Sequence, residues 1–147
     1  MKARKPFRLQ GVLRYRQQVE KQLKGELTRL TQALAEAESI RLRQFQQWES
    51  CCQTLHIMQQ AGLAATDLFI YSAFLQRLST EMRQQDQAIE GLHQAVERTR
   101  ERLEQAMRDR KILENLQQKF AFQRHKEDLR DEERTLAEMA LRRFAHE

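Results

Sequence analysis

Apolar residues recur at alternating spacings of three and four along most of the chain, the heptad pattern of helices that pair in a coiled coil. In residues 7–60, eleven of the fifteen seam positions are apolar. This first seam comprises Leu9, Leu13, Arg16, Glu20, Leu23, Leu27, Leu30, Leu34, Ala37, Arg41, Gln44, Trp48, Cys51, Leu55 and Met58. A second seam comprises Leu68, Tyr71, Leu75, Leu78, Met82, Gln85, Ile89, Leu92, Val96, Thr99, Leu103, Ala106, Arg110, Leu113, Gln117 and Phe120. The pattern therefore predicts two long helices with facing seams.

The first clustered break signal is AGLAATD at residues 61–67. Gly62 can end a helix in the left-handed conformation, and Thr66 or Asp67 can cap the next helix by accepting a backbone N–H bond. Pro6 suits a first helical turn, which does not need its missing N–H. We therefore expect one helix at about 7–60, a bend at about 61–67 and a second helix at about 67–143.

An antiparallel pairing requires the numbers of facing residues to have a constant sum. A sum of 126 faces Met58 with Leu68 and Leu55 with Tyr71, and it places the fold-back at residue 63, next to Gly62. The predicted fold is thus all-α, a single antiparallel coiled-coil hairpin formed by residues 1–147.

This register places Arg16 opposite Arg110, which is an unfavourable like-charge layer. Two solutions remain open: Glu20, one turn away, can bridge the two cations, or both side chains can extend outward.

Beyond Phe120 the seam positions become charged, because the first helix has no residues left to face them. Those positions are Arg124, Glu127, Asp131, Arg134 and Glu138. We expect residues 121–147 to overhang as a solitary helix or to fray.

The composition excludes several classes. Hydrophobic residues make up 40% and charged residues 32%, with one proline and four glycines, which argues against a sheet or a multilayer core. No uncharged apolar stretch is long enough to span a bilayer, and we expect neither a transmembrane segment nor a signal peptide. The adjacent Cys51 and Cys52 suit a reducing, cytoplasmic compartment.

Positive charge is concentrated in two segments. Residues 1–24 carry eight basic groups and one acidic group, and residues 98–126 carry nine and four. The hairpin brings these segments together, so we expect a basic end that binds an acidic protein surface, nucleic acid or an anionic membrane. Residues 127–147 hold seven acidic and four basic groups, which disfavours a phosphate backbone, and we expect no nucleic-acid partner.

Motifs for catalysis or for a cofactor are absent. Cys52 and His56 have helical i, i+4 spacing, but two ligands do not make a tetrahedral metal site. We therefore expect no enzyme activity, no cofactor and no metal.

Apolar residues outside the seam gather near the bend. They are Leu42, Phe45, Ile57, Phe69, Ile70 and Phe74. Such residues form either a contact surface for a partner or a local thickening of the seam.

Four segments carry a family resemblance: FRLQGVLRYRQQVEKQLKGEL (7–27), DLFIYSAFLQRL (67–78), RKILENLQQKF (110–120) and KEDLRDEERTLAEMALRRF (126–144). With these segments the chain resembles the FliJ family of the flagellar type III export apparatus. The resemblance implies a cytoplasmic stalk-like coiled coil, peripheral at the inner membrane. Its implied partners are the hexameric export ATPase, the export-gate membrane protein and export chaperones.

Site residues follow from the resemblance by position. Phe74 and Leu78 correspond to the gate-contacting part of the second helix, and Leu42 and Phe45 to a patch on the first. The basic ends suit insertion into the ATPase ring, and the candidates there are Arg4, Lys5, Arg8 and Lys119. The alternatives are the equivalent stalk of a virulence secretion system, a basic rod that binds nucleic acid or membrane, and a structural spacer or self-associating bundle.

Overall fold

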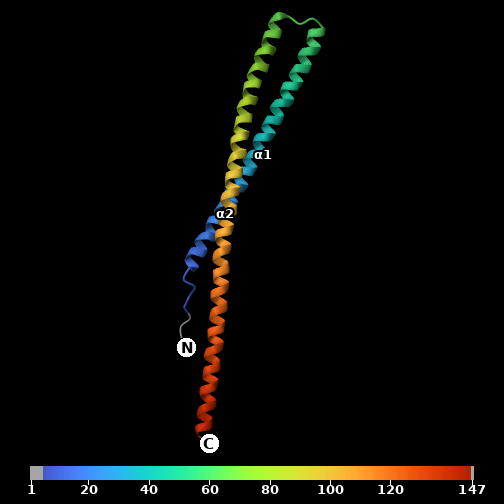
Figure 1. The fold of residues 1–147 in the computed structure, drawn as a ribbon. Coiled ribbons are helices and arrows are strands. Elements are labelled where there is room, and N and C mark those ends of the chain that lie inside the picture. Colours follow the sequence, from blue (N-terminus) through green and yellow to red (C-terminus); the bar gives the residue numbers. More distant parts are fainter. Residues whose placement is uncertain (1–4, 147) are drawn as a thin grey trace. The chain divides into compact units, whose positions relative to one another are not determined.

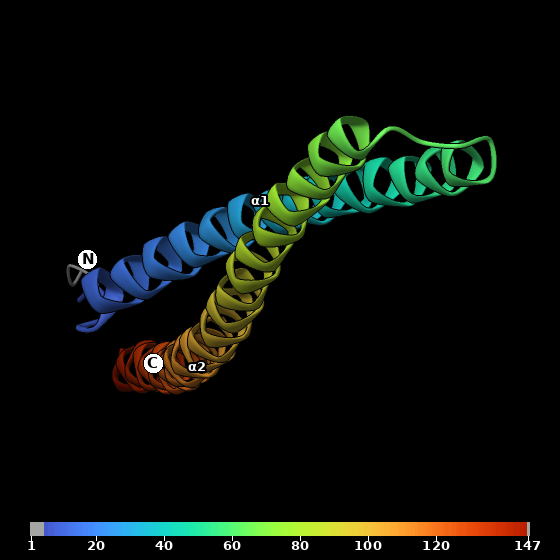
Figure 2. The same ribbon diagram turned by 90° about the horizontal axis from the view of Figure 1, so that it is seen from above.

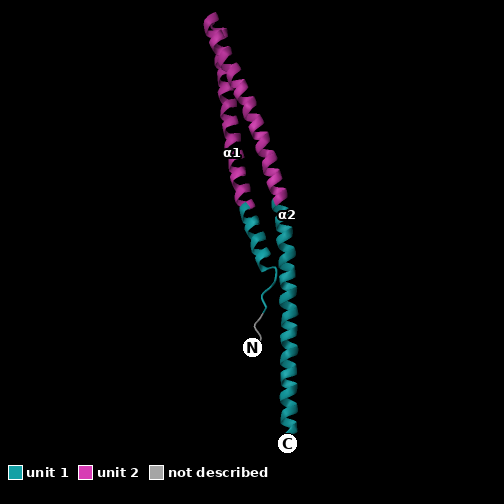
Figure 3. Cartoon of the chain, turned by 90° about the vertical axis from the view of Figure 1, so that its left-hand side faces the viewer, with its two compact units in different colours: residues 1–22, 103–147 teal, residues 23–102 magenta. Residues whose placement is uncertain are grey.

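The computed structural model describes residues 5–146, which form two helices, α1 (Gln10–Gln60) and α2 (Ala65–Ala145), and the loop between them (Figure 1). These residues include no strand. The chain divides into unit 1 (residues 1–22 and 103–147) and unit 2 (residues 23–102), each of which pairs a segment of α1 with a segment of α2 (Figure 3). The prediction of an all-α antiparallel helical hairpin is confirmed.

Burial follows the heptad pattern. All fifteen first-seam positions are buried or partly buried, and so are the second-seam positions except Leu68. Leu13 in unit 1 is only 2% exposed, and removing a leucine side chain from water to this extent contributes about 2 kcal/mol. The seams therefore form the core of both units.

Polar pairs between the helices report the register in unit 2. Arg41 Nε donates to Asp86 Oδ1 at 2.7 Å, and Gln85 Nε2 donates to the Ala37 carbonyl at 2.9 Å. The residue numbers of these pairs add up to 127 and 122, close to the predicted 126.

Unit 1 has the same register. Gln117 Nε2 donates to Gln10 Oε1 at 2.8 Å, and Arg16 Nη1 donates to Asp109 Oδ2 at 3.4 Å, with sums of 127 and 125. The predicted antiparallel register is confirmed in each unit.

The layer of Arg16 and Arg110 is neutralised by acidic partners. Arg110 forms an ion pair with the buried Glu20 and another with Glu114 at 2.8 Å. Hydrogen bonds, chiefly with Glu114 and secondarily with Glu20, raise the pKa of the Arg110 guanidinium. Arg16 pairs with Asp109 instead. Glu20 thus binds one of the two arginines, and Asp109, which was not among the predicted partners, binds the other.

The start of α1 is held by the aromatic pair of Phe7 and Phe120, whose ring centroids lie 5.4 Å apart. Arg124 donates to the carbonyl of Lys5, and its guanidinium carbon lies 5.6 Å from the Phe120 ring centroid. These contacts hold the segment before α1 against α2. The helix α1 begins at Gln10, so Pro6 lies before its first turn and not within it as predicted.

The bend contains one residue in a left-handed conformation. Gly62 has a φ of 90°, as predicted. The predicted cap at Thr66 or Asp67 is wrong, because α2 already begins at Ala65 and the Leu68 N–H donates to the Ala64 carbonyl at 3.1 Å. Asp67 lies in the first turn of α2, where its negative charge is favourable to the helix dipole.

The two helices of unit 2 separate toward the loop (Figures 1 and 2). Leu68, which was expected to face Met58 in the seam, is exposed there, and Met58 is only partly buried. The seam is therefore open near the bend.

In unit 1, α2 continues as a helix to Ala145. Every residue from His125 to His146 is exposed. The predicted overhang of the carboxyl-terminal helix is confirmed, and it is helical.

Two glycine substitutions should have opposite effects on stability. Gly62→Ala should lower the free energy of unfolding by about 1 kcal/mol, because its φ is strained for any residue with a Cβ. Gly91→Ala should raise it by about 1 kcal/mol, because Gly91 lies within α2 with open space around its Cβ position. Urea unfolding followed by circular dichroism measures both, and equal effects would contradict the assignment of the bend.

Removing one partner of the buried ion pair should destabilise the chain. Glu20→Ala should lower the urea midpoint, because the acidic group that neutralises Arg110 within the seam is lost. The double substitution Glu20→Met with Arg110→Leu should recover most of the loss, since neither charge then remains. If the single and double variants had the same midpoint, the pair would not carry the effect.

Candidate functional site: an open groove in unit 2 and a basic surface in unit 1

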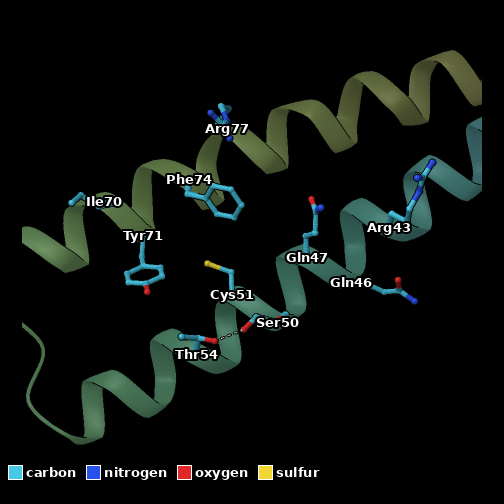
Figure 4. A pocket seen from close by; sticks show the side chains of 10 residues that line it. All are labelled: Arg43, Gln46, Gln47, Ser50, Cys51, Thr54, Ile70, Tyr71, Phe74 and Arg77. Atoms are coloured by element: carbon cyan, nitrogen blue, oxygen red, sulfur yellow. Dashed lines mark hydrogen bonds between the residues drawn. The ribbon is translucent and has the colours of Figure 1, made fainter.

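A groove lies between the two helices of unit 2, where they separate toward the bend (Figure 4). Its walls are formed by Arg43, Gln46, Gln47, Ser50, Cys51 and Thr54 of α1 and by Ile70, Tyr71, Phe74 and Arg77 of α2. Helical geometry explains the walls, because Cys51 and Tyr71 are seam positions and the other lining residues lie beside the seam where it is open. The groove is thus a consequence of helix separation.

Aromatic and apolar groups cover the inner surface of the groove. The Cys51 sulfur lies between the helices, with the rings of Tyr71 and Phe74 across from it (Figure 4). Burial, and secondarily the neighbouring Cys52, raises the pKa of the Cys51 thiol, so Cys51 stays protonated and weakly nucleophilic at neutral pH. Cys51 is therefore a wall residue with no sign of catalytic activation.

Two arginines complete the walls. The Arg77 guanidinium carbon lies 5.5 Å from the centroid of the Phe74 ring, and Arg77 Nε lies 3.8 Å from Glu81 Oε1. Arg43 is exposed, and the described residues offer it no ion pair. No acidic residue lines the groove.

The predicted gate residues all lie in unit 2, but they differ in exposure. Leu42 and Phe45 are exposed on α1, where the Phe45 ring stacks on Trp48 with centroids 6.3 Å apart. Phe74 is partly buried and lines the groove, whereas Leu78 is 3% exposed. Leu78 is therefore a core residue and does not present its side chain to a partner in this conformation.

The predicted ring residues that the structure describes lie in unit 1. Lys5, Arg8 and Lys119 are exposed, and the contact of Phe7 with Phe120 brings the segment of Lys5 and Arg8 to the part of α2 that carries Lys119. Arg4 lies outside the described residues. The structure thus unites three of the four basic candidates on one region of unit 1.

Heptad spacing does not predict the groove as a site. Cys51 and Tyr71 were assigned to the seam, and neither Arg43 nor Arg77 was singled out. A usable signal was present in residues 50–76, whose only formal charge belongs to Asp67, in a chain with 32% charged residues. Exposed apolar residues in this stretch include Phe69, at 75% exposure, and Ile57.

Metal binding finds little support at the pair Cys52 and His56. His56 Nε2 lies 3.3 Å from the Gln60 side-chain nitrogen. In residues 5–146 no group of three or more histidine, cysteine or acidic side chains is arranged to hold a metal ion. Nor does this part of the chain contain a helix with the length and apolarity needed to cross a bilayer.

Comparison with protein families agrees with the residues that suggested the resemblance. The model of the family described as the flagellar FliJ protein matches residues 4–147. Comparisons with curated proteins and with solved structures give no significant match. The family match covers nearly the whole chain, and the chain therefore belongs to the FliJ family, whose members are non-enzymatic components related to flagellar export.

Proposed function

We propose that the chain is a stalk-like regulator of the hexameric flagellar export ATPase that also contacts the export gate and export chaperones. The observation that carries this proposal is the family match over residues 4–147. The chain has no catalytic role in this scheme. It acts by binding the ATPase ring and by favouring one nucleotide state of the ring over another.

Ring binding is assigned to unit 1. Lys5, Arg8 and Lys119 are exposed, and long basic side chains on a helical rod attract an acidic protein surface and orient its approach. A rod in the central hole of a ring touches successive subunits unequally, and unequal contacts favour one nucleotide state over another. This differential binding stimulates turnover without chemistry on the rod.

Gate binding is assigned to unit 2. Leu42 and Phe45 are exposed, and Phe74 lines the open groove, which supports an apolar contact surface. Leu78 takes the indirect role of packing the α2 segment that carries Phe74. Exposed aromatic residues of this kind commonly dominate the energy of an interface.

The remaining partner and the location are proposed by analogy with the family. Export chaperones are proposed as partners without an assigned surface. Because the gate is a membrane protein, we place the chain at the cytoplasmic face of the inner membrane.

The flagellar family match favours this function over the virulence-system stalk. The alternative of a basic rod that binds nucleic acid or membrane rests on charge alone.

Neutralising the basic surface of unit 1 should impair ATPase stimulation. The variant with glutamine at Arg4, Lys5, Arg8 and Lys119 should require about tenfold more protein for half-maximal stimulation, because each lost surface pair weakens binding modestly and the losses add up. A titration of purified export ATPase with the variant measures this.

The control variant carries glutamine at Arg29 and Arg83, which are exposed in unit 2 and lie outside both basic segments. It should stimulate normally. Full stimulation by the unit 1 variant, or an equal loss in the control, would contradict ring binding through unit 1.

Truncating Phe74 should weaken gate binding without unfolding the chain. Phe74→Ala should lower affinity for the export-gate protein by about tenfold, the typical cost of losing an aromatic anchor. Helicity should stay unchanged, since Phe74 is only partly buried. Surface plasmon resonance measures the affinity and circular dichroism the helicity.

Phe122→Ala is the control, because Phe122 is an exposed phenylalanine of unit 1. It should bind the gate as the unchanged chain does. If Phe74→Ala bound the gate protein with unaltered affinity, the assignment of the gate contact to Phe74 would be wrong.

A further inference from the structure

Along α1, the groove in unit 2 has the length of a short helical segment. Its α1 wall runs from Arg43 to Thr54, which at the rise of an α-helix is about 16 Å. A helix of about ten residues has this length. The groove opens because α1 and α2 separate, so it offers two diverging helix faces between which a third helix can pack.

The chemistry of the walls favours an amphipathic occupant. Ile70, Tyr71, Phe74 and Cys51 offer apolar surface, which an occupant must match with apolar side chains. Gln46 and Gln47 add neutral donors and acceptors on the α1 side. The apolar face of a bound helix would cover the four apolar side chains, while the polar edge of the same helix would contact the two glutamines.

The charge of the walls further restricts the occupant. Arg43 and Arg77 are the only charged residues among the lining residues, and both are positive. Arg77 is already oriented over the Phe74 ring, with a long contact to Glu81 that leaves its side chain 70% exposed. Guanidinium groups recognise carboxylates in bidentate geometry, so complementary charge on the occupant is acidic.

We propose that this groove binds a short amphipathic helix of a partner protein, whose apolar face covers Phe74 and whose carboxylates pair with Arg43 and Arg77. The inference rests on the proposed gate contact through Phe74. It adds the location of the contact, which is the groove between α1 and α2, and the chemistry of the gate segment that binds there. A lipid surface is the competing occupant, because exposed apolar residues next to arginines also suit an anionic membrane.

The adjacent cysteines provide an internal probe of occupancy. Cys51 lines the groove, whereas Cys52 is not among the lining residues, and both are partly buried. Two full-length single-cysteine variants are needed, Cys52→Ser to retain Cys51 and Cys51→Ser to retain Cys52. Their reaction with a maleimide is followed by mass spectrometry, alone and with purified export-gate protein.

At a gate concentration of ten times the Kd, Cys51 should react about tenfold more slowly, because about one chain in eleven stays unoccupied. Cys52 should react at nearly its original rate. Equal protection of both cysteines, or of neither, would contradict the proposal that the gate protein binds in the groove.

Charge reversal tests the acidic chemistry separately. Arg43→Glu with Arg77→Glu should abolish the protection of Cys51 and lower gate affinity, and the loss should shrink as salt is raised. Arg29→Glu with Arg83→Glu, exposed in the same unit, is the matched control and should retain protection. Unchanged protection of Cys51 in the Arg43→Glu, Arg77→Glu variant would contradict the proposal that the bound segment is acidic.

These outcomes separate the inference from the proposed function. If Phe74→Ala weakens gate binding but Cys51 is never protected, the gate contact through Phe74 is supported and binding within the groove is contradicted. If phosphatidylglycerol vesicles alone protect Cys51, the occupant is lipid and the inference is overturned. If the gate protein does not bind the chain at all, both fail.

Discussion

The interhelical seam is the interaction on which both units depend. Each helix presents an apolar stripe that is only two positions wide per heptad, and a long helix in water gains little from its own hydrogen bonds. Burial of this stripe against an antiparallel segment therefore supplies most of the stability. Leu13 and Ala106 form this core in unit 1, and Leu23, Leu78 and Val96 do so in unit 2. The rest of each surface is free to carry charge.

Polar pairs across the seam specify the register more than they add stability. Leucines in successive layers are nearly equivalent, so a slip by one heptad would keep most apolar contacts. It would separate Arg41 from Asp86 in unit 2, and in unit 1 it would separate Glu20 from Arg110 and Gln10 from Gln117. Leaving such groups unpaired within a seam is costly, which penalises the wrong alignment.

The proposed functional surfaces arise where the seam is incomplete. In unit 2 the helices separate near the bend, and the stretch of residues 50–76 with a single formal charge exposes apolar side chains there. In unit 1 the aromatic pair of Phe7 and Phe120 holds the basic amino-terminal segment along α2. The proposed contacts thus use the parts of each helix that its own fold leaves uncovered.

The amino-acid sequence by itself determined the two helices, the positions of the seam, the antiparallel register and the need for glycine at residue 62. These features depend on the period of the helix and on pairwise matching of apolar positions, both of which can be read from residue spacing. Only the tertiary structure decided that Arg16 pairs with Asp109, that α1 begins at Gln10 and that Leu68 is exposed while Arg43, Cys51 and Phe74 share a groove. These features depend on the distance between the helix axes and on the reach of side chains from both helices, which heptad spacing does not specify.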